Sequence, residues 1–271
     1  MRDNCIICSK QLKFFFSKTF YAFGLEIVDY YRCEHCGLVI SKTHFDLSDK
    51  RWIDLNSQYH ESYFKNGSNP DDVNWNSRLR CQADTIKKLS NANLLATSQH
   101  WVDYGSGDGT LASLLNSQGL TIFKYDEYIR QTGTQYLSRD ELLSTQYDLV
   151  VCTSVFEHVR RIDVLDEINS LVSGNGVMAL HTLVCDEIPK DPEWFYLLPV
   201  HCLFFTNRSM EILFRRWGYV ASIYHVASRM WFLFKNPTVL TQESVDALNV
   251  GASGENLFIY KAAFVDYWKT K

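Results

Sequence analysis

The chain has 271 residues, of which 46% are hydrophobic, and its formal net charge is −4 at pH 7. This length suffices for one large core with a small accessory module, and the mild acidity argues against a nucleic-acid-binding protein. No apolar run reaches the roughly 18–20 residues that span a bilayer, and the N-terminus lacks the apolar stretch of a signal peptide. We therefore expect a cytoplasmic protein with no membrane partner, whose eight cysteines are thiols or metal ligands rather than disulfides.

Residues 1–45 contain two Cys-x-x-Cys pairs, Cys5/Cys8 and Cys33/Cys36. Two such pairs can complete the tetrahedral four-thiolate site that zinc favours. Four thiolates leave no open position, so we expect a structural zinc; redox pairs or unligated thiols are the alternative. The aromatic segment between the pairs predicts a small β-rich module closed by the metal, and His35 is not expected to coordinate it.

Residues 46–95 are polar and helical in pattern, which predicts a helical linker or lid. Tyr59, Tyr63 and Phe64 recur at helical spacing, which favours a packing face over a lid on a bound ligand. Residues 66–70 predict a loop, and a longer helix is expected from about residue 76 to 90.

Residues 96–271 alternate predicted strands and helices, beginning at a strand that runs into Gly105, Gly107 and Gly109. This alternation predicts an α/β fold: a Rossmann-like, doubly wound, seven-stranded sheet. Further strands are expected at 120–126, 135–138, 147–152, 176–182, 219–226 and 230–234, with helices at 163–172 and 209–217 among them. A polar helix at 242–249 and a strand-like tail at 257–268 follow; the tail could cover a sheet edge, contact the first module or form a homodimer surface.

The glycine turn predicts a nucleotide site, for either a dinucleotide or S-adenosylmethionine (SAM). The spacing Gly-x-Gly-x-Gly differs from the Gly-x-Gly-x-x-Gly of pyrophosphate sites. Asp103, in the strand before the turn, would repel a pyrophosphate but could hold the cationic amino-acid end of SAM. Asp126, 21 residues after Gly105, stands where a ribose-binding carboxylate is expected. SAM is therefore favoured.

Residues 102–109, 147–159 and 171–178 resemble three motifs of class I SAM-dependent methyltransferases, and the resemblance covers roughly 95–235. With the cysteine module in front, the chain resembles the methyltransferases of deoxysugar and surface-polysaccharide pathways. The cofactor-binding residues that the resemblance and the pattern indicate are Asp103, Tyr104, Gly105, Ser106, Gly107, Asp126, Glu127, Leu137, Thr153 and Ser154. In this family, the turn would line the methionine end, Asp126 the ribose, Leu137 with Ser138 the adenine, and Thr153 with Ser154 the sulfonium. Asp140 is an alternative match for the acid that usually follows the third strand.

A hydroxyl or carbon acceptor must lose a proton, and histidine is the usual base near neutral pH. His201 is the preferred base, because in related sugar C-methyltransferases a Glu-His pair before an aromatic strand is the active-site motif; here Val200 replaces the acid. Glu157 and His158 are further catalytic candidates, although Glu157 could instead orient a loop or cap a helix. His181 is expected to be a core histidine.

The aromatic loop 185–196 is expected to build the acceptor pocket, with Trp194 and Tyr196 able to stack on a sugar. We therefore expect SAM-dependent O- or C-methylation of a sugar, linked to a nucleotide, as the function. The alternatives are methylation of another small metabolite, or a non-enzymatic protein in which the zinc module binds a partner.

Overall fold

The computed structural model describes residues 3–64, 74–96, 100–128, 135–236, 238, 240–252, 254 and 257–266, and of 62–64 only the backbone. The predicted loop 66–70 and the side chains of Tyr63 and Phe64 lie outside the described residues. The strands are β1 (Leu12–Phe20), β2 (Glu26–Cys33), β3 (Val39–Ser41), β4 (Trp101–Tyr104), β5 (Phe123–Tyr125), β6 (Tyr147–Thr153), β7 (Val172–His181), β8 (Val184–Cys185), β9 (Leu203–Thr206), β10 (Ala221–His225), β11 (Met230–Phe234) and β12 (Phe258–Lys261). The helices are α1 (Lys42–Asp46), α2 (Asp49–Phe64), α3 (Trp75–Asn91), α4 (Thr110–Ser117), α5 (Arg139–Leu143), the 3-10 turn η1 (Phe156–His158), α6 (Ile162–Ser170), α7 (Asn207–Arg216) and α8 (Gln242–Leu248).

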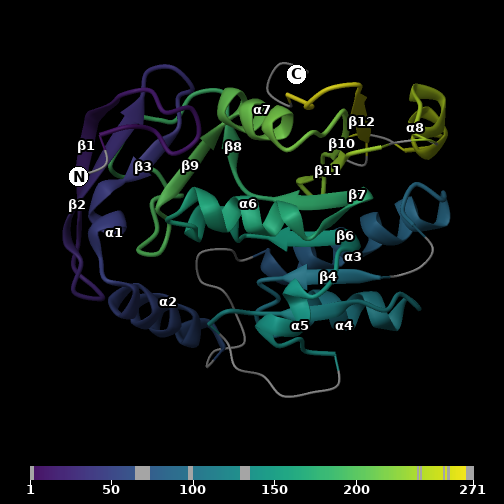
Figure 1. The fold of residues 1–271 in the computed structure, drawn as a ribbon, viewed down its shortest axis with the longest axis horizontal. Coiled ribbons are helices and arrows are strands. Elements are labelled where there is room, and N and C mark those ends of the chain that lie inside the picture. The colour runs from purple at the N-terminus through teal and green to yellow at the C-terminus, as the bar shows by residue number, and fades with distance from the viewer. Residues whose placement is uncertain are drawn as a thin grey trace.

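The cysteine-rich segment forms a sheet that later strands complete. In the order β1-β2-β3-β9-β8, the antiparallel strands β1 to β3 continue into β9 and β8. The junction is the antiparallel pairing of Val39 with Phe204 and of Ile40 with Leu203. Figure 1 shows β1, β2 and β3 at one end of the molecule, with β9 and β8 nearer its middle, α2 below β1 to β3, and α8 and β12 at the opposite end. The N-terminal segment is therefore bonded directly to the chain just after residue 201.

The main sheet has seven strands in the order β12-β10-β11-β7-β6-β4-β5. Strands β5, β4, β6 and β7 are parallel, whereas β11, β10 and β12 are added in antiparallel fashion. This mixed α/β fold with seven strands agrees with the predicted Rossmann-like fold. The strand in the tail is β12, which pairs with β10 and forms one edge of the main sheet. Of the three roles expected for the tail, this corresponds to the one at the sheet edge.

The predicted strand at 135–138 is wrong. There, Tyr136 forms only an isolated parallel bridge with Lys124. The chain turns into α5 at once, because Ser138 is its N-cap and forms a capping box with Glu141. The seven strands are completed by β12 instead.

Helices cover both faces of the main sheet, and the strands are apolar on both faces. On β6 and β7 the side chains alternate between two cores. Val150 and Met178 pack toward α6 and α7, in the core that also includes the N-terminal sheet. Leu149 and Val177 pack toward α3, α4 and α8. Among the described helices, none combines the length and apolar character required to cross a membrane.

Candidate functional site

A glycine turn follows β4 and opens α4. Gly105, Gly107 and Gly109 all have positive φ, at +73°, +55° and +77°, a region that other residues enter only with strain. A Cβ on Gly105 would come within 2.6 Å of Val155 Cγ2, whereas one on Gly107 would meet no atom within 4 Å. The turn therefore leaves open space above Gly107 while Gly105 packs against the end of β6.

Asp126, just after β5, is held under this turn. Its Oδ2 accepts a hydrogen bond from Gly107 N–H at 2.8 Å, and its Oδ1 accepts one from Tyr128 N–H at 2.9 Å. The neighbouring Glu127 accepts a hydrogen bond from the Tyr125 hydroxyl and lies 3.5 Å from Arg139 Nη1. The geometry thus fixes the carboxylate of Asp126 beside the glycine turn.

Asp103, at the carboxyl end of β4, is buried beneath the turn with only 1% of its surface exposed. Burial, together with the negative charges of Asp126 and Asp108, raises the pKa of Asp103 to about 7. Its Oδ1 has no hydrogen-bond partner among the described residues. A cationic group that donates a hydrogen bond would satisfy this oxygen, so the residue suits the ammonium end of SAM.

The end of β6 carries a strained residue. Ser154 has φ of +57°, its N–H donates to His181 O at 2.9 Å, and its Oγ lies 3.2 Å from His181 Nδ1. Left-handed backbone in a residue other than glycine is common at binding sites. Burial, with Arg78 and Arg229 nearby, lowers the pKa of His181 well below its usual value, so this histidine is neutral.

Glu157, His158 and His201 converge shortly after the end of β6, with one potential ligand atom of each within 4.8 Å of the others. The ring centroids of His158 and His201 are 4.9 Å apart, and that of His60 on α2 is 5.4 Å from His158. Burial lowers the pKa of both His158 and His60, and neighbouring imidazoles add to the effect at His158. Burial raises the pKa of Glu157, whose Oε1 accepts a hydrogen bond from the Tyr196 hydroxyl at 2.8 Å.

His201 is oriented by its backbone surroundings. Its Nδ1 lies 2.9 Å from Tyr196 O, and because a carbonyl only accepts, Nδ1 carries the proton. In the neutral form of the ring, the lone pair is therefore on Nε2. The segment is positioned from the N-terminal side as well, since His44 Nε2 donates to Pro199 O at 2.8 Å.

One cleft of about 1360 Å³ brings the predicted residues together. Every predicted catalytic and cofactor-binding residue lines it except Leu137, which lies outside, as do Ser138, Asp140 and Trp194. Tyr196 lines the cleft, as expected for the aromatic loop.

Sequence reasoning missed several cleft residues: His60, Arg78, Tyr128, Arg139 and Arg229. His60 and Arg78 come from α2 and α3, whose polar patterns do not distinguish them from a solvated face. Arg229 has φ of +53° in the turn between β10 and β11, a conformation that the sequence does not signal.

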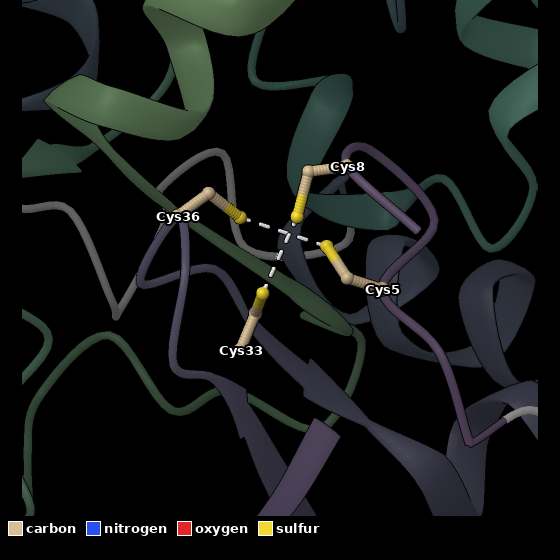
Figure 2. Close-up of side chains that lie close together, drawn as sticks. All are labelled: Cys5, Cys8, Cys33 and Cys36. Atoms are coloured by element: carbon tan, nitrogen blue, oxygen red, sulfur yellow. Dashed lines mark hydrogen bonds between the residues drawn. The ribbon is translucent and has the colours of Figure 1, made fainter. Parts of the chain in front are cut away.

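The side chains of the four N-terminal cysteines point toward one another (Figure 2). Sγ atoms are 3.6 Å apart for Cys5 and Cys36, and 3.4 Å apart for Cys8 and Cys33, and all four lie within 4.8 Å of one another. A tetrahedral ion with zinc–sulfur bonds of about 2.3 Å would hold its sulfurs about 3.8 Å apart. The donor set therefore fits zinc, with all four positions supplied by protein.

Comparison with known proteins identifies the family of the main domain. A family model described as a methyltransferase domain matches residues 76–221, more than half of the chain. No protein of curated function matches the chain. Solved structures with similar folds include magnesium protoporphyrin IX methyltransferase from Synechocystis PCC 6803 with bound SAM, at 12% identity and a TM-score of 0.46, covering 70% of this chain and 99% of that one.

Two further similar structures are also methyltransferases. The plantazolicin methyltransferase BpumL with SAH has 13% identity and a TM-score of 0.41, and the likeness covers 81% of this chain and 91% of that one. Human N-acetylserotonin methyltransferase with SAM has 12% identity and a TM-score of 0.39, covering 72% and 71% respectively. Because the family match spans the glycine turn, Asp103, Asp126 and the strand end that leads to Glu157, the chain belongs to the methyltransferase-domain family and is an SAM-dependent methyltransferase.

Proposed function

We propose that the chain methylates a hydroxyl oxygen or an acidic carbon of a small sugar linked to a nucleotide, with His201 as the general base. The observation that carries the base assignment is the hydrogen bond from His201 Nδ1 to Tyr196 O, which leaves the Nε2 lone pair as the proton acceptor. His201 and the glycine turn line the same cleft.

The residues of the turn suit the methyl donor. When bound, SAM supplies an electrophilic methyl group on a sulfonium. Asp103 would accept a hydrogen bond from the ammonium, Asp126 would accept from the ribose hydroxyls, and Ser154 would lie near the sulfonium. His201 would take the acceptor's proton as the new bond to carbon forms and the carbon–sulfur bond breaks.

The size and lining of the cleft support a second, anionic substrate. Its volume of about 1360 Å³ exceeds the roughly 300–1000 Å³ of a pocket for one small molecule. Phe195 and Tyr196 offer ring faces on which a sugar or base could stack. Arg78 and Arg229 line the same cleft and supply positive charge for a phosphate group.

We also propose that Cys5, Cys8, Cys33 and Cys36 hold one structural zinc ion. The support is the convergence of four thiol groups at separations that match a tetrahedral site. Metal analysis should give one zinc per chain, bound by the cysteines, and a folded protein without metal would contradict this proposal.

The substrate is tested with SAM that carries a labelled methyl group. The chain is incubated with nucleotide-linked sugars, free sugars and other small metabolites, and we expect label in a nucleotide-linked sugar. Label confined to another class would overturn the substrate proposal while leaving the enzyme assignment intact.

The base is tested separately. His201→Ala should leave SAM affinity unchanged and reduce kcat by about 10²–10⁴-fold, with partial rescue by added imidazole. His35→Ala, at an exposed histidine, is the matched control and should retain full turnover. Unaltered turnover of His201→Ala would remove His201 as the base.

A further inference from the structure

Glu157, His158 and His201 form a second cluster of potential metal ligands, inside the cleft and separate from the four cysteines. Each offers one ligand atom, and these atoms all lie within 4.8 Å of one another. We propose that this cluster binds one divalent transition-metal ion, such as zinc, and that the bound ion blocks methyl transfer. Metal binding stands on the geometry alone, whereas the block rests on the proposed role of His201 as the base.

Two of the three ligands have buried atoms that no other described residue satisfies. Glu157 Oε2 and His158 Nδ1 are both inaccessible to solvent and have no hydrogen-bond partner in the part of the chain that the structure describes. Leaving such an atom unpaired destabilises the folded protein, so each of the two atoms needs a partner that accepts a lone pair. A metal ion between the two side chains is such a partner.

Tyr196 orients two of the three ligands, Glu157 and His201, from outside the cluster. Its hydroxyl donates to Glu157 Oε1 at 2.8 Å, which turns the other carboxylate oxygen away from Tyr196. Its carbonyl accepts the hydrogen bond from His201 Nδ1 at 2.9 Å. Histidine ligands commonly donate their second nitrogen to a carbonyl in this way, which fixes the coordinating nitrogen as Nε2.

The donor set selects the kind of metal. Two imidazole nitrogens and one carboxylate oxygen suit zinc, iron(II), cobalt(II) or nickel(II) rather than magnesium, which favours oxygen ligands and water. Ligand atoms at bonds of about 2.0–2.1 Å from a tetrahedral zinc would be about 3.3 Å apart, so each donor needs to move by less than about 1 Å. Three protein ligands would leave one position open toward the cleft.

Metal binding and proton abstraction would compete for the same lone pair. His201 Nε2 is the nitrogen that we propose as the base, and a coordinated nitrogen cannot accept a proton. The ion would also occupy the space beside the acceptor. The metal-loaded protein should therefore bind SAM but not turn over, and a chelator that strips only the weaker site should restore activity.

The test is equilibrium dialysis of the full chain, with its cysteine site already loaded with zinc, against cobalt(II) and zinc(II). We expect one additional ion per chain. Tyr196→Phe removes a residue that orients a ligand and should lower the metal affinity of the additional site by roughly 10–100-fold. His158→Ala and Glu157→Gln each remove a ligand and should lower this affinity by more than that. His181→Asn, another cleft histidine outside the cluster, is the matched control and should retain the second ion.

Cobalt(II) separates the two sites, because thiolate ligands give intense charge-transfer bands and nitrogen–oxygen ligands do not. An additional ion with the nitrogen–oxygen spectrum, lost in the variants, supports the site. Metal bound only at the cysteines would refute it, even if the methyltransferase assay confirmed His201 as the base. A second ion that raises turnover would overturn the proposed block. Thermal unfolding of each variant shows whether a lost ion reflects a lost fold.

Discussion

SAM affinity should depend on pH through Asp103. In the free protein, burial and two nearby carboxylates hold the pKa of Asp103 at about 7. The folded pKa is raised, so this group is ionised only as pH rises through 7 and is protonated below it. If only the ionised carboxylate accepts the ammonium of SAM, the apparent Kd varies inversely with the fraction of Asp103 that is ionised. Between pH 7 and pH 6, the Kd should rise about fivefold, while the ammonium stays protonated.

Isothermal titration calorimetry measures this effect in two ways. The Kd measured at several pH values gives the pH dependence of SAM affinity directly. Titrations at pH 7 in buffers of different ionisation enthalpy should show release of about half a proton per SAM bound. Asp103→Asn should weaken binding at pH 7 and remove both signals. The same variant should raise the Tm of the free protein, because a buried ionised carboxylate destabilises the fold above its unfolded pKa. A pH-independent wild-type Kd, or an unchanged slope in Asp103→Asn, would refute the role of Asp103.

Three further predictions concern the turn, the metal and the sheet edge. Gly105→Ala places a Cβ 2.6 Å from Val155 Cγ2 at a residue with left-handed backbone, so the SAM affinity measured by calorimetry should fall at least about 10-fold. Gly174→Ala is the control, because its Cβ would meet no atom within 4 Å, and it should change neither the affinity nor the Tm. Chelation of the zinc that we propose at the four cysteines should lower the Tm by more than about 5 °C and abolish turnover. An unchanged Tm after complete metal removal would exclude a structural ion. Phe258→Ala on β12 should cost about 3–5 kcal/mol of unfolding free energy in urea titrations, against little change for the half-exposed neighbour Leu257→Ala.

The glycine turn and its acids could be predicted because their chemistry is local. Gly105 and Gly107 need positive φ within one turn, and Asp126 reaches that turn from the end of the next strand. The apolar stretches of β6 and β7 likewise indicate strands that are covered on both faces of the sheet. The position of each of these features follows from residues close to it in the chain.

The stretch at 135–138, where a strand is predicted, is followed at once by a local signal for a helix. Ser138-Arg-Asp-Glu141 has the spacing of a capping box, which predicts a helix start at residue 139. The replacement strand β12 begins more than 30 residues after β10, and nothing near either strand indicates that they pair.

The acceptor side of the cleft could not be predicted, because its residues meet through long-range contacts. His60 reaches His158 only because α2 lies between the N-terminal sheet and the cleft. In α2 itself, a histidine among polar residues has no distinguishing pattern. Tyr196 was expected to stack on a ligand, but its contacts with both Glu157 and His201 depend on how the loop after β7 folds back.

The N-terminal module has a direct structural route to the proposed base. Thr206 Oγ1 donates to the carbonyl of Cys36, so the cysteine turn is bonded to the residue that caps α7. The pairing of β3 with β9 fixes the chain immediately after His201. His44, whose pKa burial lowers to about 4, stays neutral and holds Pro199 just before it. If the four cysteines hold zinc as proposed, its removal should disturb the segment that carries His201 more than the region around Asp103. The two halves of the cleft should therefore respond differently to zinc removal.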